Sequence, residues 1–140
     1  MKHLLLLLSV AYLVSCATSK ITTYEYLTGT RGYSLTIKVT EDEITVTERK
    51  GTASPINMEM VTNPILWTSL QNGSKKIELS KISELESPTH RRETDAAMFS
   101  RVVFTTVDST YKSSSFDHGQ PPIMLKIVVD SLVNLKSHEK

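Results

Sequence analysis

The sequence predicts an α+β domain in which an antiparallel sheet of about four to six strands carries two helices on one face. Two observations predict this class. First, segments in which apolar and polar residues alternate with period two are interspersed with two helical segments that begin at prolines. Second, the order strand, turn, strand, proline-bearing loop, helix occurs twice, over residues 32–71 and 99–135. Because residue identities do not repeat, a ββα duplication is a hypothesis about architecture only. The second sheet face, rich in threonine and serine, is expected to remain solvated.

The first half of the chain predicts three strands. Residues 21–27 form the first, and residues 28–32, with two glycines, form a turn or bulge. Residues 33–40 alternate apolar and polar side chains and predict a half-buried strand. The acidic residues 41–43 make the next turn. Residues 44–47 then return as the hairpin partner, because β-branched side chains suit a pleated surface.

A loop over residues 51–62 leads to the first predicted helix. Asn63 suits the N-cap and Pro64 suits the first helical position, so the helix is expected to cover residues 65–70 and to end at Gly73. The apolar residues of this short helix are expected to face the core.

The second half begins with weak signals and continues with stronger ones. Residues 77–79 predict a short strand, and residues 82–85 predict a helical turn that ends before a proline. Residues 98–107 predict a long strand, residues 108–110 a turn, and residues 111–116 the return strand. Pro121 and Pro122 then begin the second helix. Its apolar side chains recur at helical spacing and are expected to close the core: Leu125, Val128, Val129, Leu132 and Leu135.

The start of the chain has a different character from the rest. Lys2 is a basic start, residues 4–14 are almost entirely apolar, and Leu13-Val14-Ser15-Cys16 places small residues before a cysteine. This tetrapeptide resembles the lipobox of bacterial lipoproteins. The resemblance implies that residues 1–15 are a signal peptide that is removed, that the Cys16 thiol carries diacylglycerol, and that Cys16 becomes the new N-terminus. Two or three acyl chains anchor a protein stably, whereas one binds reversibly.

The resemblance also implies a location. Residues 16–20 are a short lipidated tether, and residues 21–140 are a single domain close to the membrane. Ala17, rather than an aspartate, follows the cysteine, which in Gram-negative lipoproteins favours the periplasmic face of the outer membrane. The alternatives are the periplasmic face of the inner membrane and the cell surface. The run from Tyr111 to Pro122, the chain length and the leader together resemble small envelope lipoproteins of uncharacterised function.

Three other interpretations of the leader remain open. A transmembrane helix needs about 20 apolar residues, more than this run contains. An ordinary secretory signal cut after Ala17 would make Cys16 incidental. A buried strand or helix would show an amphipathic period, which consecutive leucines do not.

Composition limits the classes of function. Cys16 is the single cysteine, so a disulfide framework, a thiolate metal site and a cysteine nucleophile are excluded once it is lipidated. Lys2 is the only formally charged residue of the leader, and its removal leaves 15 basic and 15 acidic residues. This balance argues against nucleic acid as a partner. No cofactor fingerprint is present, and neither a cofactor nor a metal site is expected.

Five residues of catalytic or binding type are candidates for a ligand site: His90, Arg92, Asp95, Asp117 and His118. They would share one pocket if the loop before the long strand met the loop before the last helix, which a hairpin of residues 98–107 and 111–116 permits. The simpler interpretation is that the first loop is a solvated charged connection and that Asp117 shapes a turn ahead of the helix.

The sequence thus favours a lipid-anchored, non-enzymatic binding or assembly module that faces the periplasm, with an envelope protein or polymer as its partner. No catalytic residue is assigned. The alternative is a small-ligand or metal-binding domain, or a hydrolase, that uses the five candidate residues.

Overall fold

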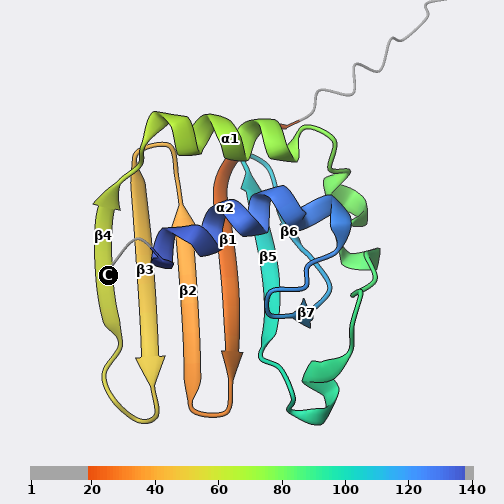
Figure 1. Ribbon diagram of the computed structural model, residues 1–140. Coiled ribbons are helices and arrows are strands. Elements are labelled where there is room, and N and C mark those ends of the chain that lie inside the picture. The colour runs from red at the N-terminus through yellow and green to blue at the C-terminus, as the bar shows by residue number, and fades with distance from the viewer. Residues whose placement is uncertain (1–18, 138–140) are drawn as a thin grey trace, which may run out of the picture.

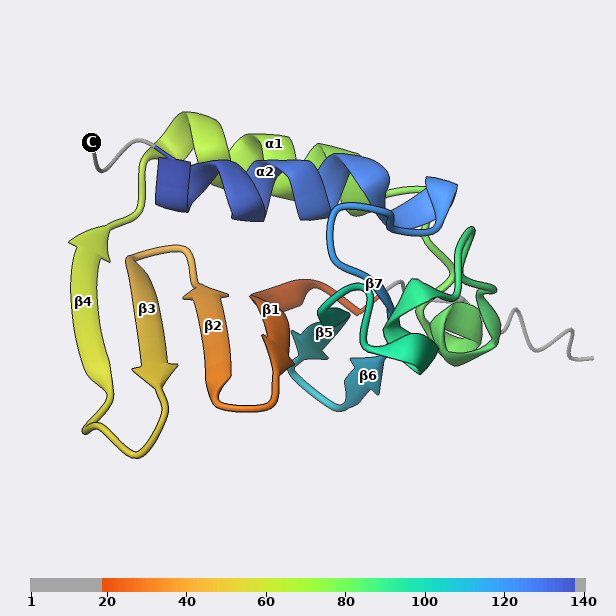
Figure 2. The same ribbon diagram turned by 60° about the horizontal axis from the view of Figure 1, so that its bottom comes forward.

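The computed structural model describes residues 19–137, with side chains through Leu135, so the predicted signal peptide and Cys16 lie outside the described residues. Two layers form the domain: one antiparallel sheet and two helices, α1 and α2, which lie side by side on one face of it (Figures 1 and 2). The sheet has seven strands in the order β4-β3-β2-β1-β5-β6, with β7 paired to β5. The predicted α+β class is confirmed. The strands are β1 (Ile21–Thr30), β2 (Tyr33–Val39), β3 (Glu43–Lys50), β4 (Ile56–Val61), β5 (Phe99–Thr106), β6 (Thr110–Lys112) and β7 (Phe116–Asp117); the α-helices are α1 (Pro64–Ser74) and α2 (Lys126–Ser137).

The central strand, β1, pairs with β2 on one side and β5 on the other. Thr30 lies opposite Tyr33, so only Arg31 and Gly32 form the turn between β1 and β2. Gly32 has φ +76°, a conformation that glycine adopts without strain. The turn is therefore shorter than the predicted one, and β1 is three residues longer than the predicted strand.

The core lies between the sheet and the helices. Tyr24 is fully buried at its centre, where its ring meets Trp67 and Phe104 edge to face at centroid distances of 5.5 and 5.7 Å. The alternate positions of the strands, such as Thr36 and Thr45, are partly exposed on the other face, as predicted. The other buried core residues of the strands and helices are Ile21, Tyr26, Leu35, Ile37, Val39, Ile44, Val46, Leu70, Ile82, Val102, Phe116, Leu125, Val128, Val129 and Leu132.

Helix α1 begins as predicted but ends later. The Asn63 side chain accepts a hydrogen bond from the Ile65 amide at 2.8 Å, and Pro64 occupies the first turn. Gly73 does not end the helix, which continues to Ser74. A Cβ at Gly73 would lie 2.8 Å from Ile127 Cγ2, so glycine here allows α1 and α2 to approach each other. The predicted end of the helix was wrong because the glycine serves packing.

Two other predictions differ from the structure. Strand β4 lies inside the predicted loop 51–62 and pairs with β3 as the edge of the sheet. Its asparagine and glutamate are weak strand formers, so pairing with β3 outweighs their propensity. The predicted strand 77–79 is absent, and a 3₁₀ helix, η1 (Leu79–Glu84), covers most of the predicted helical turn. Because β4 lies between β3 and α1, the first proposed ββα unit has three strands before its helix instead of two.

The return strand after β5 is interrupted. Ser113 Oγ accepts a hydrogen bond from the Val102 amide at 3.1 Å, and the Ser113 amide donates to the Val102 carbonyl at 2.9 Å. The chain then leaves β5 toward η1, where Ser114 Oγ donates to the Leu85 carbonyl. Pairing resumes at β7, which places Phe116 opposite Ser100. The predicted single strand 111–116 is thus divided into β6 and β7 by hydroxyl groups that compete with the backbone ladder.

The second helical segment forms as predicted, with a 3₁₀ turn, η3 (Ile123–Leu125), leading into α2.

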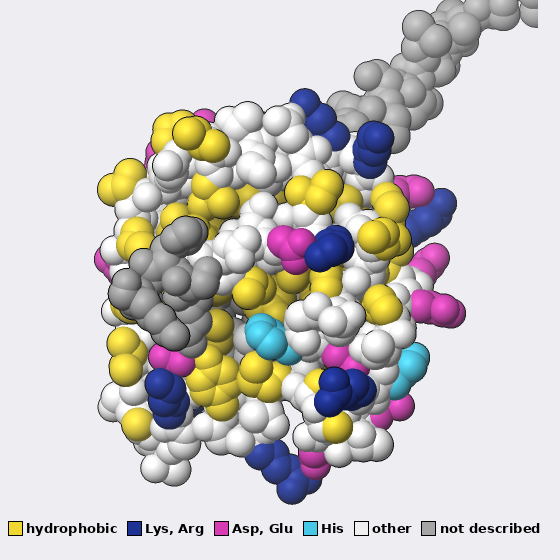
Figure 3. All heavy atoms as spheres, in the orientation of Figure 1, with side chains coloured by type: hydrophobic (Ala, Val, Ile, Leu, Met, Phe, Trp, Pro, Cys, Tyr) yellow, Lys and Arg dark blue, Asp and Glu magenta, His cyan; other side chains and the backbone are white. Residues whose placement is uncertain are grey.

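Hydrophobic side chains gather around both helices on the face of the molecule that carries α1 and α2 (Figure 3). Among residues 19–137, no helix combines the length and apolar character needed to cross a bilayer.

Candidate functional site

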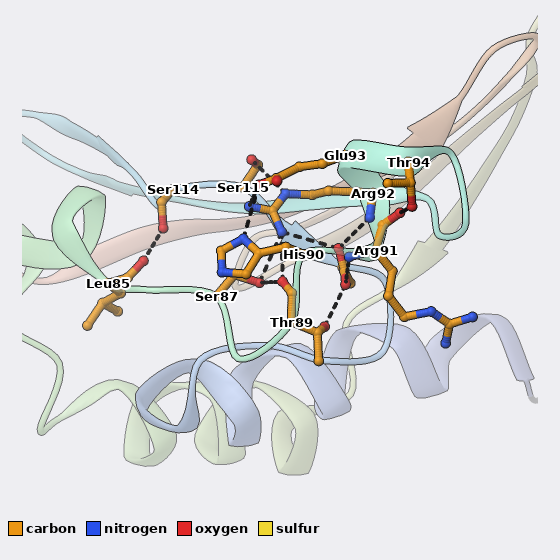
Figure 4. Close-up of polar contacts among 11 residues, drawn as sticks. Leu85, Ser87, Thr89, His90, Arg91, Arg92, Glu93, Thr94, Ser114 and Ser115 are labelled. Carbon is orange, nitrogen blue, oxygen red and sulfur yellow. Dashed lines mark hydrogen bonds and ion pairs between the residues drawn. The ribbon is translucent and has the colours of Figure 1, made fainter.

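The loop before β5 meets the loop before α2 at Asp117, as the candidate site requires. Asp117 lies opposite Phe99 at the start of β5 and is 1% exposed. Its carboxylate accepts hydrogen bonds from Thr89 Oγ1 at 2.5 Å, from the Arg91 amide at 2.7 Å and from the Arg92 amide at 2.9 Å (Figure 4). The two amides belong to a short 3₁₀ helix, η2 (Arg91–Thr94). The carboxylate therefore fixes the start of this helix to β7.

Arg92 completes the same cluster. Its Nη1 lies 3.2 Å from Asp117 Oδ1 and donates to the Thr89 carbonyl at 2.9 Å, while its side chain is only 15% exposed. Further bonds run from Nη1 to Ser87 Oγ at 3.2 Å and from Nε to Ser115 Oγ at 3.3 Å. One guanidinium thus connects the segment before η2 with the segment before β7. We call Thr89, Arg91, Arg92 and Asp117 the loop clip.

The loop clip sets the charge state of its carboxylate. Burial acts to raise the pKa of Asp117, but the hydrogen bonds from Thr89, from the amides of Arg92 and Arg91 and from the Arg92 guanidinium outweigh it and hold the pKa well below its ordinary value. The carboxylate therefore stays ionised near neutral pH. Its donors occupy both oxygens, so this group holds the loops together and is unsuited to proton transfer.

His90 and Asp95 lie at the two ends of η2 and are exposed. His90 Nδ1 lies 3.0 Å from Glu93 Oε1, and both side chains are more than 60% exposed. Asp95 has φ +55° and ends the 3₁₀ helix, its amide donating to the Arg92 carbonyl at 3.4 Å. Both residues thus follow the simpler interpretation of this segment, a solvated charged connection.

His118, although adjacent to Asp117, belongs to a second cluster. Its Nδ1 lies 2.7 Å from the Tyr26 hydroxyl, 3.3 Å from Thr28 Oγ1 and 3.5 Å from Ser100 Oγ. Tyr26 and Ser100 are fully buried, and Thr28 is 2% exposed. We call Tyr26, Thr28, Ser100 and His118 the hydroxyl cluster. It occupies the helix-facing side of β1 and β5, whose other core positions are mainly apolar.

The contacts of the hydroxyl cluster define the direction of its protons. Thr28 donates to the Phe99 carbonyl at 2.9 Å, and Ser100 donates to Thr28 Oγ1 at 3.0 Å. Ser100 Oγ, 2.7 Å from the Tyr26 hydroxyl, is then an acceptor, so Tyr26 donates to it. Tyr26 has a single proton, so its oxygen accepts from His118 Nδ1. We therefore assign the tautomer of neutral His118 with the proton on Nδ1 and an acceptor lone pair on Nε2.

The state of Tyr26 agrees with this assignment. Burial raises the pKa of its phenol, and the weaker influence of its hydrogen bonds with Ser100 and Thr28 opposes that shift. The phenol is therefore neutral and remains able to donate its proton.

A cavity of about 130 Å³ adjoins the hydroxyl cluster. Its polar boundary is formed by Tyr26, Thr28 and His118. The remaining lining side chains are largely apolar and come from β2, α2 and the residue before β5: Tyr33, Leu35, Ile37, Met98 and Val133. The cavity therefore combines an apolar wall with one polar side.

The five candidate residues thus divide between two settings: Arg92 and Asp117 form the loop clip, with His90 and Asp95 beside it, and His118 joins the hydroxyl cluster. Sequence reasoning missed Tyr26, Thr28 and Ser100. The available signal was positional, because these residues occupy core-facing positions of their strands. Within residues 19–137, no group of three or more His, Cys, Asp or Glu side chains is arranged to hold a metal ion.

Comparison with known proteins does not assign the chain to a family. No protein-family model matches the sequence, and no curated protein matches it significantly.

Proposed function

We propose that this chain is a lipid-anchored protein of the bacterial cell envelope and that its domain is a non-enzymatic binding or assembly module on the periplasmic side of the outer membrane. The observation that carries the proposal is Leu13-Val14-Ser15-Cys16 at the end of an apolar leader. Lipidation of Cys16 after removal of residues 1–15 would hold the domain at the bilayer, and Ala17 favours the outer membrane.

The start of the described chain supports a close attachment. Lys20 Nζ lies 3.4 Å from Glu41 Oε2, and Ser19 Oγ donates to Asp108 at 3.2 Å, so both residues already contact turns at one end of the sheet. Five Cα–Cα steps separate Cys16 from Ile21, a reach of at most about 18 Å. The end of the sheet where β1 begins would therefore lie nearest the membrane.

Two surfaces support a binding or assembly role. Strand β4 forms one edge of the sheet in the described part of the chain. Two of its side chains, Ile56 and Val61, are 57% and 86% exposed. An edge strand presents backbone groups that can pair with a strand of another protein. The threonine-rich sheet face, where Thr36 lies opposite Thr47, offers hydroxyl groups to a protein or an envelope polymer.

The test is intact mass spectrometry of the protein extracted from membranes, with Cys16→Ala as the variant and Ser19→Ala as a control that keeps the cysteine. We expect wild type and Ser19→Ala to have the mass of residues 16–140 plus acyl chains. Cys16→Ala should lack the acyl mass and leave the membrane fraction after a salt wash. A wild-type mass equal to the unmodified secreted chain or to the uncut chain would contradict the anchor.

Density-gradient separation of the two membranes, with protease treatment of whole cells, tests the location. Outer-membrane fractionation with protection from protease agrees with the proposed face. Inner-membrane fractionation or cleavage of intact cells would instead support one of the alternative locations.

The alternative function, a ligand site or hydrolase that uses all five candidate residues, has less geometric support. The contacts of Arg92 and Asp117 are those of a structural clip, while His118 borders a cavity with different neighbours. A role in small-ligand binding is therefore best placed at His118.

A further inference from the structure

We propose that the groove between α1 and α2 rests on the phospholipid surface, so that the helix layer of the domain faces the bilayer and the sheet faces away from it. The inference rests on the lipid anchor proposed above, to which it adds the orientation of the domain. Three features carry it: an uncharged groove with exposed isoleucines, the short distance from this groove to the tether, and the charges on the opposite face.

The groove has a volume of about 650 Å³ and is built mainly by α1, with Ile127 of α2 on its other side. The exposed lining residues of α1 recur at the spacing of one helix face: Ile65, Thr68, Ser69 and Asn72. Every residue that lines the groove is uncharged. Contact with lipid would therefore remove no charge of the groove from water.

The side chains of the groove suit the boundary between head groups and acyl chains. Ile65 is 78% exposed and Ile127 is 61% exposed. A helix that lies in the membrane interface buries such apolar side chains and keeps its polar groups at the level of the head groups. Lys75 and Lys76 follow α1 and are exposed, so their stems can cover apolar surface while their ammonium groups meet lipid phosphates.

The tether brings this groove to the membrane. Gln71 Nε2 donates to the Ile21 carbonyl at 3.0 Å, so α1 contacts the first residue of β1. Asn72 and Gly73, the next two residues of α1, line the groove. Cys16 can lie at most about 18 Å from Ile21, and a helix with its side chains is about 10 Å wide. The anchor therefore reaches the outer face of α1, which crosses the end of the sheet where β1 begins (Figure 1).

The opposite face of the sheet is unsuited to lipid. Thr45 on that face lies between Lys38 of β2 and Glu59 of β4, and both charged side chains are exposed. Contact with lipid would withdraw these charges from water at a high cost. With the helix layer on the bilayer, the threonine-rich face and the edge strand β4 remain accessible to a partner.

The experiment uses ¹⁵N-labelled wild type that is extracted from membranes and reconstituted into phosphatidylcholine nanodiscs with a spin-labelled phospholipid. We expect the amides of residues 65–73 and of Ile127 to lose most of their ¹H–¹⁵N signal. Amides of the turns at residues 31–32 and 51–55 should keep theirs, because β1 spans about 30 Å from the docked end. Loss confined to the turns at residues 40–42 and 107–109, loss on the threonine-rich face, or no localised loss would overturn the proposal.

Substitutions in the groove test the location of the contact. Ile65→Glu combined with Ile127→Glu should restore the α1 signals while the anchor keeps the protein in the nanodisc. Ile56→Glu, the same change at a 57% exposed isoleucine of β4, should leave the loss of α1 signal unchanged. Serine at positions 65 and 127 should restore the signals in part, and it serves as the test if glutamate lowers the urea midpoint. An unchanged loss in both groove variants, or equal restoration by Ile56→Glu, would place the contact elsewhere.

The intact mass of the reconstituted sample separates this proposal from the anchor itself. Acyl mass together with signal loss on α1 supports both proposals. Acyl mass without that loss overturns the docking and leaves the anchor in place. A mass without acyl chains overturns the anchor, and the docking proposal falls with it.

Discussion

Replacement of Tyr26 by phenylalanine should destabilise the fold far more than the same replacement at Tyr24. Both side chains are fully buried, lie two residues apart on β1 and face the helices, so the lost atom and its surroundings are closely matched. The two side chains differ in the hydrogen bonds that their hydroxyl groups make. The Tyr26 hydroxyl bonds both Ser100 and His118, while the Tyr24 hydroxyl bonds Ser74 alone.

The magnitudes follow from the groups left behind. Tyr26→Phe removes the donor to Ser100 Oγ and the acceptor of His118 Nδ1, and each buried polar group deprived of its bond costs about 1–3 kcal/mol. Thr28 Oγ1, 3.3 Å from Nδ1, takes over part of the second bond, so the total is about 2–4 kcal/mol. After Tyr24→Phe, Ser74 Oγ keeps its bond to the Gln71 carbonyl at 3.1 Å, and the cost is about 1 kcal/mol.

Urea unfolding of the full chain measures both changes. Trp67 is the single tryptophan and is 8% exposed, so its fluorescence reports loss of the core. The slope of the unfolding free energy against urea should be unchanged, and only the midpoints should differ. Equal losses of stability in the two variants, or a smaller loss for Tyr26→Phe, would refute the idea that the Tyr26 hydroxyl holds the hydroxyl cluster together.

Two further predictions concern helix packing and pH. Gly73→Ala should lower the free energy of unfolding by about 1 kcal/mol, because overpacking against Ile127 outweighs the gain in helix propensity. In an Ile127→Ala background the same change should raise the free energy of unfolding. Calorimetry of the four proteins measures both effects, and a loss of stability in both backgrounds would contradict the packing explanation. The pKa of Asp117 is lowered in the folded state, so its contribution to stability is present above its unfolded pKa, near 4, and is lost as pH falls through the folded value. Urea midpoints between pH 2 and 7 should therefore fall more steeply at acid pH for wild type than for Asp117→Asn, and parallel curves would argue against the loop clip.

Local signals in the sequence were sufficient for the elements with strong patterns. Asn63 and Pro64 identify the start of α1 because both act through their own side chains on adjacent backbone. The alternation of apolar and polar residues likewise predicts β2, and the helical spacing of apolar residues predicts α2, without information about the elements that pack against them. Strand β4 was missed because Asn57 and Glu59 disfavour strands and interrupt its apolar residues, so that its pairing with β3 decides its conformation.

The candidate site was predictable only in part. The meeting of the two loops followed from the hairpin topology, and the contact between Arg92 and Asp117 fulfils that requirement. The separation of Asp117 from His118 depends on the pairing of β7 with β5, which a two-residue strand does not reveal in sequence. The hydroxyl cluster depends on the register that sets Thr28 opposite Ser100, a long-range relation that the spacing of residues does not encode.

The position of β1 in the sheet has a mechanical consequence for an anchored protein. The strand begins at Ile21, directly after the proposed tether, and is hydrogen-bonded on both sides, to β2 and to β5. Tension between the membrane and a partner on the domain would pass along β1 and load both ladders in shear. Bonds loaded in shear share the force, and β1 has two such ladders, whereas an edge strand would have only one. A pull from the bilayer would thus act on a strand that is held on both sides.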